Sequence, residues 1–128
     1  MSEQLVRRAV DAFMARDLDA ILALADPRIE LRSLLTEAER PLYHGHEGVR
    51  DWFDAVFGVF PDWRPAPRAA VSYDDGGSVV LALDVTAHGA GSGAPIDQTY
   101  WLGARTEADK ITFFGFFRTE PDALEAVT

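Results

Sequence analysis

The 128-residue sequence contains no cysteine. Disulfide bonds, thiol nucleophiles and thiolate metal sites are therefore excluded, and a reducing compartment is compatible with the composition. Long hydrophobic runs are also missing. No segment approaches the roughly 18 apolar residues that cross a bilayer, and the N-terminal residues lack the pattern of a signal peptide. We therefore expect a cytoplasmic protein without a membrane-bound segment.

Positive charge is scarce as well. Lysine and arginine number 12 against 21 aspartate and glutamate residues, which gives a formal net charge of -9. Such an acidic surface repels phosphate backbones, so we expect no nucleic-acid partner. The chain is nevertheless 48% hydrophobic. This is enough to build one apolar core, and the length predicts a single domain over residues 1–128.

The most informative segment runs from Tyr43 to Trp63. Its apolar residues recur at spacings of three and four, which predicts one broad apolar stripe on a helix: Val49, Trp52, Phe53, Val56, Phe57 and Phe60. Pro61 prevents the helix from continuing. So many aromatic rings in about three turns exceed what a small surface helix needs. We expect this helix to form the wall of a large apolar interior, either a plain core or a ligand pocket.

The remaining segments predict an α+β fold. We expect a helix over 3–15 capped by Ser2, a short helix capped by Asp17, a turn at Asp26-Pro27, a strand over 28–35 and a surface loop over 36–41. Strands are expected over 63–73, 79–88, 94–104 and 110–118, joined by turns at 74–77, 89–93 and 107–109, with a terminal helix over 122–127. This order predicts a curved antiparallel sheet with helices on one face, shaped as a cone whose mouth could hold a small molecule.

Four segments in this order resemble a known family. They are Arg16-Asp17-Leu18-Asp19, the stretch from Tyr43 to Phe53, the stretch from Gly89 to Asp97, and the stretch from Asp122 to Ala126. Together they resemble the SnoaL-like branch of the nuclear-transport-factor-2-like superfamily, which also holds ketosteroid isomerases, limonene epoxide hydrolases and scytalone dehydratase. The resemblance implies a cone-shaped α+β barrel with a deep apolar pocket, a homodimer formed through the sheet, and no cofactor.

The resemblance does not carry over a complete catalytic set. The position of the ketosteroid isomerase tyrosine falls at Ala9, and the position of its base falls near Leu31 or Arg32. Its protonated aspartate corresponds to Asp97 in one register and to Trp101 in another. Isomerisation by that mechanism is therefore not expected, because two of the three groups are missing.

The candidate catalytic residues are Asp97 and His44. A carboxyl group in an apolar pocket can serve as acid or base, and histidine titrates near neutrality. A guanidinium such as that of Arg118 or Arg32 could orient a carbonyl or an anionic group, although each also fits a surface role. His44 and His46 alone are too weak a pattern to predict a metal site. Candidate ligand contacts are Phe13, Tyr43, Trp52, Phe53, Phe57, Trp63, Trp101, Phe116 and Arg118. Parity with the pocket-lining residues of ketosteroid isomerases implies that Phe114, Phe116 and Arg118 face inward. The opposite face would then carry Ile111, Phe113 and Phe117, an apolar surface expected to form the dimer interface.

Three functions remain open from the sequence. The first is a cofactor-free isomerase, cyclase or dehydratase acting on a small hydrophobic carbonyl compound, such as a polyketide, steroid-like or terpenoid intermediate. The second is a non-catalytic dimeric domain that binds a ligand or a partner chain in the same cone. The third is a stable domain whose interior is filled by its own rings. A hollow that contains Asp97 or His44 would favour the first.

Overall fold

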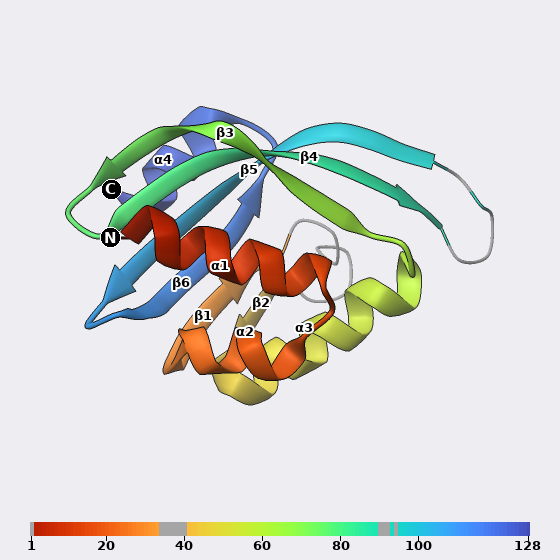
Figure 1. Ribbon diagram of the computed structural model, residues 1–128, viewed down its shortest axis with the longest axis horizontal. Coiled ribbons are helices and arrows are strands. Elements are labelled where there is room, and N and C mark those ends of the chain that lie inside the picture. Colours follow the sequence, from red (N-terminus) through yellow and green to blue (C-terminus); the bar gives the residue numbers. More distant parts are fainter. Residues whose placement is uncertain (1, 34–40, 90–92, 94) are drawn as a thin grey trace.

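The computed structural model describes residues 2–33, 41–89, 93 and 95–128. A curved six-stranded sheet packs against three helices on its inner face (Figure 1). The helices are α1 (Ser2–Met14), α2 (Leu18–Leu24), α3 (Gly45–Val59) and α4 (Glu120–Val127). The strands are β1 (Ala25–Arg32), β2 (Leu42–His44), β3 (Arg64–Asp75), β4 (Ser78–His88), β5 (Pro95–Glu107) and β6 (Lys110–Phe117), in the spatial order β2-β1-β6-β5-β4-β3. The predicted α+β class with a curved sheet is confirmed.

Helix α3 is the aromatic helix that the sequence predicts. Val49, Trp52 and Val56 are buried on one side of it, as the spacing of three and four requires. The helix begins at Gly45, where a φ of 70° favours glycine and a Cβ would lie only 3.3 Å from the Pro27 carbonyl oxygen. None of the helices in the described ranges is long and apolar enough to span a membrane.

The break between α1 and α2 follows the predicted capping pattern. Arg16 adopts a left-handed φ of 57° just after α1, and the Asp17 carboxylate accepts a hydrogen bond from the Ala20 N–H at 3.1 Å at the start of α2. The predicted cap at Ser2 is wrong. Ser2 lies within α1, and its hydroxyl instead pairs with the Thr106 hydroxyl at 2.9 Å, which ties the helix to β5.

Strand β1 differs most from its prediction. It begins at Ala25, so the predicted turn at Asp26-Pro27 lies inside the strand. The proline nevertheless has a local effect, because the register with β6 shifts between Ala25 and Glu30. The Asp26 side chain stabilises this irregularity by accepting from the Arg28 N–H at 2.8 Å.

Two features of the sheet were not predicted. Strand β2 is a three-residue edge strand that pairs antiparallel with β1, and β1 pairs parallel with β6. The remaining pairs are antiparallel, as expected. The hairpin turn at Gly76-Gly77 is confirmed by positive φ values of 60° and 86°. Loops were also predicted over residues 36–41 and 89–93, and most of these residues lie outside the described ranges.

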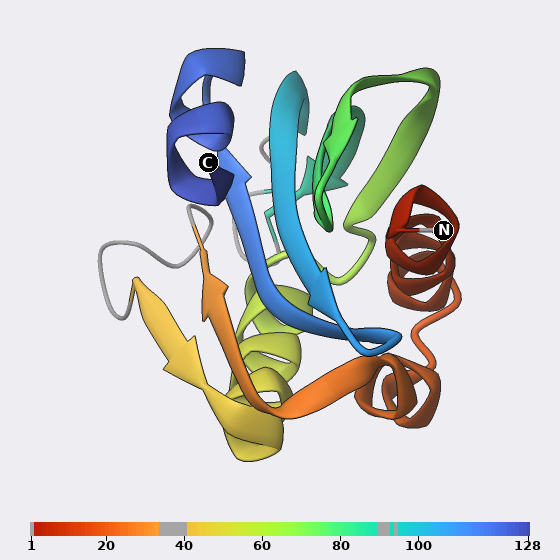
Figure 2. The same cartoon turned by 90° about the vertical axis from the view of Figure 1, so that its left-hand side faces the viewer.

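Helix α4 covers part of the outer face of the sheet, on the opposite side from α1 (Figure 2). It is N-capped by Thr119, and it packs Ala123 and Val127 against Val80 and Phe117. The helix can approach because residue 103 is a glycine, where a Cβ would lie only 3.2 Å from the Ala123 carbonyl oxygen. The sequence predicts helices on one face only, so this position is a correction.

The outer face is therefore less apolar in the folded protein than the sequence suggests. Phe117 points outward as predicted, but it is buried beneath α4. Ile111 was also expected on the outer face, and that prediction is wrong. A register shift between Arg105 and Thr106 turns Ile111 into the inner core. Dimerisation through this face stays a prediction.

Candidate functional site

A hollow of about 790 Å³ opens where the C-terminal end of β6 meets α4 and the β1–β2 edge. We call it the α4 hollow. Its lining comes from three parts of the chain: Arg32, Ser33, Pro41 and Leu42 from the β1–β2 edge, Phe116, Phe117 and Arg118 from the end of β6, and Asp122, Glu125 and Ala126 from α4. This volume suits a small organic molecule.

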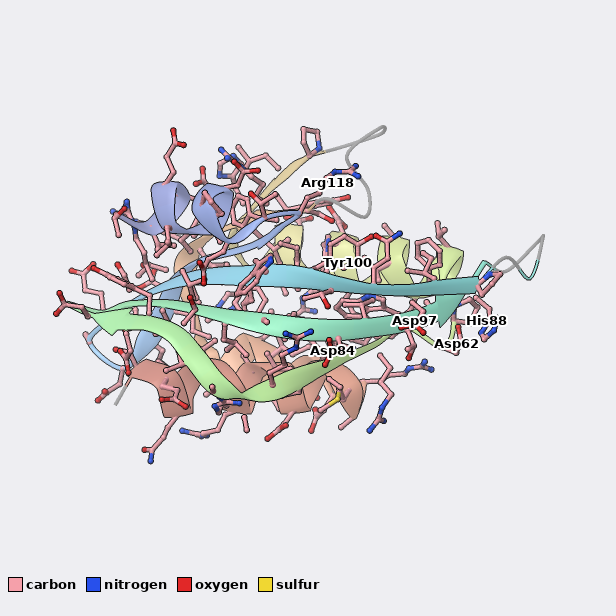
Figure 3. The ribbon with its side chains drawn as sticks, turned by 90° about the horizontal axis from the view of Figure 1, so that it is seen from above. Asp62, Asp84, His88, Asp97, Tyr100 and Arg118 are labelled. Carbon is pink, nitrogen blue, oxygen red and sulfur yellow. The ribbon has the colours of Figure 1, made fainter. Side chains whose placement is uncertain are left out.

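The alternation of the strands decides which side chains reach the hollow. Phe116 lies on the inner face of the sheet, beside the equally buried Ser33. Arg32 follows the opposite parity and is exposed. Arg118 comes directly after the last residue of β6, so it projects from the strand end and is exposed at the rim (Figure 3). The hollow thus has a polar rim and an apolar inner end.

Five packed rings, which we call the aromatic cluster, lie behind that inner end: Phe13, Trp52, Trp63, Phe114 and Phe116. Phe116 belongs to both the cluster and the hollow, because its ring stacks on Trp52 with centroids 5.5 Å apart and planes at 11°. The Trp52 Nε1–H donates to the Ser33 hydroxyl at 2.7 Å. Of the two alternatives open for the interior beside α3, the cluster therefore forms a plain core.

The side chains that line the α4 hollow carry equal numbers of positive and negative charges. Two guanidiniums, from Arg32 and Arg118, share the lining with two carboxylates, from Asp122 and Glu125. Within the described part of the chain, none of these four side chains forms a hydrogen bond or an ion pair with another side chain. Both guanidiniums can therefore donate to a ligand, and the balanced lining favours a neutral ligand over a multiply charged one.

A smaller hollow of about 330 Å³ adjoins the first on the outer face. It shares Arg32 and Ala126 with the α4 hollow, and its other lining residues are Glu30, Arg105, Thr112 and Phe113. Arg32 thus stands between the two spaces. The shared residues make the two hollows neighbours along the same side of α4.

The structure brings together two of the predicted ligand contacts, Phe116 and Arg118, at the α4 hollow. It does not bring the predicted catalytic pair together. Asp97 lies on β5 and His44 on β2, which are three strands apart in the sheet, and the pairing through β1 and β6 puts His44 level with Arg105, far along β5 from Asp97. Both side chains are exposed, and neither lines the α4 hollow. Figure 3 shows Asp97 well separated from Arg118.

The other predicted contacts fall into three groups. Phe13, Tyr43, Trp52 and Trp63 are buried in the main core. Phe53 and Phe57 are half-buried on α3, where the Arg16 guanidinium lies 4.6 Å above the Phe57 ring. Trp101 is on the outer face and packs near α4. These groups supply core and surface packing, and two of their members, Trp52 and Trp63, contact the Phe116 ring at the inner end of the hollow.

Asp62 forms a polar pair with His88 beyond the far end of the sheet, near Asp97 (Figure 3). Asp62 accepts from both the backbone N–H and the Nδ1 of His88, each at 2.7 Å. The side-chain hydrogen bond is the main reason that the pKa of Asp62 is lowered. This pair joins the turn after α3 to the end of β4.

A second polar group lies on the outer face of the sheet. The Arg68 guanidinium donates to Asp84 at 3.0 Å and to the Thr99 hydroxyl at 3.0 Å. The hydrogen bond from Arg68 lowers the pKa of Asp84, and Asp84 in turn raises the pKa of Arg68. Among the described residues, no group of three His, Asp or Glu side chains is arranged to hold a metal ion.

Sequence reasoning missed seven of the lining residues: Ser33, Pro41, Leu42, Phe117, Asp122, Glu125 and Ala126. Alternation along the strand groups Ser33 with Ile29 and Leu31, and all three are buried. No signal in the sequence could have joined Ser33 to α4, because the two segments are far apart along the chain. The capping pattern of Thr119 and Pro121 locates α4 but not the face of the sheet on which it packs.

The chain belongs to the SnoaL-like family, whose model, described as a SnoaL-like domain, matches residues 6–114. The match covers most of the fold but ends before Phe116, Arg118 and α4. No functionally curated protein matches the sequence. The predicted resemblance to this branch of the nuclear-transport-factor-2-like superfamily is confirmed.

Solved structures share the fold at low sequence identity. A nuclear-transport-factor-2-like protein from Burkholderia pseudomallei K96243 superimposes with a TM-score of 0.82 at 20% identity, over 99% of this chain and 97% of that one. TerC, co-crystallized with polyporic acid, gives 0.80 at 18% identity over 98% and 96%. A protein from Catenulispora acidiphila DSM 44928 with a ketosteroid isomerase-like fold, in complex with trimethylamine, gives 0.77 at 15% identity over 96% and 91%.

Proposed function

We propose that this protein binds a small, largely apolar carbonyl compound in the α4 hollow, with Arg118 donating to the carbonyl oxygen. The observation that carries the proposal is the pairing of an apolar inner end, formed by Phe116, with a guanidinium at the rim that pairs with no side chain of the described residues. A polyketide, steroid-like or terpenoid compound has this combination of apolar bulk and carbonyl oxygen. TerC and the Catenulispora acidiphila protein, each crystallised with a small molecule, support the idea that this fold accommodates small organic ligands.

We favour binding over proton transfer by the predicted pair. A general acid or base must reach the substrate, and a carboxyl group gains a useful pKa chiefly by burial. Asp97 and His44 are exposed and lie away from the hollow. The proposal therefore follows the second of the functions left open by the sequence, and catalysis by Asp97 or His44 stays an untested prediction.

The test compares tetralone with tetralin, which has the same two rings and no carbonyl group. Binding is measured by isothermal titration calorimetry with the wild-type protein, Arg118→Met and the matched control Arg64→Met. Arg64 is an exposed arginine on β3, outside the hollow. Because Arg118 is solvent-exposed, its hydrogen bond to a carbonyl contributes modestly, and we expect R118M to weaken tetralone binding about threefold to tenfold.

R64M should bind tetralone as the wild type does, and tetralin should be insensitive to R118M because it offers no acceptor. Chemical shift changes at Phe116 and Ala126 would locate the ligand independently. Equal affinities for tetralone and tetralin, or tetralone binding that does not respond to R118M, would contradict the proposal.

A further inference from the structure

Trp63 carries a buried hydrogen-bond donor that has no acceptor. Its side chain is 2% exposed, and its Nε1–H is the one buried side-chain polar atom in the described part of the chain without a hydrogen-bond partner. Trp52, its neighbour in the aromatic cluster, differs because its Nε1–H donates to Ser33 at 2.7 Å. Buried donors are nearly always paired, so an unpaired one marks a place where an acceptor would be bound favourably.

The surroundings of Trp63 explain why the protein supplies no acceptor. The neighbouring rings are Phe13, Trp52, Phe57 and Phe116, with centroids 5.5 to 6.1 Å from that of Trp63 and planes inclined at 68° to 85°. Ring edges and faces offer at most weak interactions with an N–H group. An oxygen atom brought in by a ligand would therefore provide what the cluster lacks.

Only one ring separates this donor from the α4 hollow. Phe116 lines the hollow, and its ring meets that of Trp63 at 5.8 Å and 81°. Ser33, which also lines the hollow, lies directly behind the same ring through its hydrogen bond to Trp52. Phe116 is therefore the side chain that would have to move for the hollow to reach Trp63.

We propose that the ligand of the α4 hollow carries a second carbonyl oxygen, which accepts a hydrogen bond from Trp63 Nε1 once the Phe116 ring has turned aside. This inference rests on the proposed function, in which the first carbonyl oxygen is held by Arg118 at the rim. The ligand class is accordingly a compact cyclic dicarbonyl compound, such as a quinone or a cyclic diketone. Its rings occupy the apolar space between the two donors, and Trp52 takes no part because its N–H is engaged by Ser33.

Naphthoquinone with para carbonyl groups, tetralone and tetralin form the probe series, with two, one and no carbonyl oxygens. The quinone is usable because the chain has no cysteine to which it could add. In the wild-type protein we expect naphthoquinone to bind about tenfold more tightly than tetralone in calorimetric titrations. Trp63→Phe should remove this preference, because phenylalanine keeps an aromatic ring but has no N–H.

Trp101→Phe is the matched control. Trp101 is a half-buried tryptophan of the outer face, outside the aromatic cluster, so its replacement should leave the preference for naphthoquinone unchanged. R118M should weaken both carbonyl probes. This pattern assigns one carbonyl oxygen to each donor.

A measurement on the wild-type protein covers the case in which Trp63→Phe does not fold. The chain has three tryptophans, so proton–nitrogen correlation spectra contain three indole N–H signals. The Trp63 signal should move downfield with naphthoquinone and stay in place with tetralin. An unmoved Trp63 signal, or one that shows contact with a bound water in the complex, would overturn the inference, whereas tetralone binding that still depends on Arg118 would leave the proposed function standing.

Discussion

Replacement of Gly115 by alanine should disturb both the stability of the protein and the α4 hollow. A Cβ at this position would lie 2.8 Å from Cε2 and 2.9 Å from Cζ of Phe117, and 3.0 Å from Cζ of Phe113. Real Cβ atoms do not approach other carbons so closely, so the rings must move. Phe117 cannot move freely, because α4 covers it and its Cε2 already lies 3.3 Å from the position of a Cβ on Gly103.

The size of the effect follows from two opposing terms. Overpacking a well-packed region costs about 1–3 kcal/mol, while replacing glycine within a strand recovers about 0.5–1 kcal/mol of backbone entropy. We expect Gly115→Ala to lower the free energy of unfolding by about 1–2 kcal/mol. For a domain of 128 residues this corresponds to a melting temperature lower by about 3–8 °C.

Urea denaturation followed by tryptophan fluorescence would measure the loss. The control is Gly58→Ala in α3, where nothing lies within 4 Å of the added Cβ, so this variant should gain about 0.5–1 kcal/mol. Phe117→Leu removes the clashing atoms, and the double variant G115A/F117L should therefore be more stable than the sum of the single changes predicts. A G115A variant as stable as the wild type, or strict additivity with F117L, would refute the account of how α4 packs.

The same structure leads to two further predictions. Ser33→Ala leaves the buried Trp52 N–H without its 2.7 Å partner, so it should lower the free energy of unfolding by about 1–3 kcal/mol in urea titrations. The control is Ser72→Ala at an exposed position, which should change the free energy of unfolding by no more than about 0.5 kcal/mol. Equal losses in the two variants would contradict the hydrogen bond between Trp52 and Ser33. The lowered pKa of Asp62 means that its stabilising contribution is fully present above the ordinary value of 3.8 and is lost as the pH falls through the lower folded-state value. Asp62→Asn should therefore lower stability at neutral pH and flatten the acid limb of the stability–pH profile, and an unchanged acid limb would show that the pair with His88 does not form in solution.

The parts of the fold that the sequence predicts well are those fixed by neighbouring residues. The stripe of α3 depends on the helical period alone, and Val49, Trp52 and Val56 are buried as that period requires. The Gly76-Gly77 turn depends on the tolerance of glycine for positive φ. Asp17 likewise caps α2 with its own side chain. No distant part of the chain has to be known for any of these features.

The parts that the sequence does not predict depend on partners far along the chain. Strand β2 is too short to show an alternating pattern, and its existence depends on pairing with β1. The parallel contact between β1 and β6 joins distant segments, as in the pairing of Leu31 with Phe114. The register shift at Arg105 and Thr106 changes the parity of Ile111 without any proline or glycine beside it. Simple alternation counted from the end of the strand therefore fails there.

The position of the ketosteroid isomerase aspartate on β5 illustrates the same limit, because the resemblance left Asp97 and Trp101 as alternatives. Asp97 and Trp101 have the same parity, and the structure places both on the outer face, opposite Thr86 and Ala82 of β4. The inner face of this strand carries Ile96, Gln98 and Tyr100 instead. Neither register could have put a carboxylate inside the cone. Because Asp97 and Trp101 lie on the same face, alternation along the strand does not distinguish between them.

The filled interior bears directly on what the protein can do. A pocket that transfers protons needs a desolvated group able to accept one, and the described residues at the inner end of the α4 hollow provide none. Phe116 is apolar, the Ser33 hydroxyl is engaged with Trp52, and the carboxylates of the hollow belong to the exposed residues Asp122 and Glu125. A donor that lines the hollow is the Arg118 guanidinium, and the proposed movement of Phe116 would add the Trp63 N–H behind it. With donors at both ends, the proposed site would hold a carbonyl compound in one orientation, and we therefore expect selective binding.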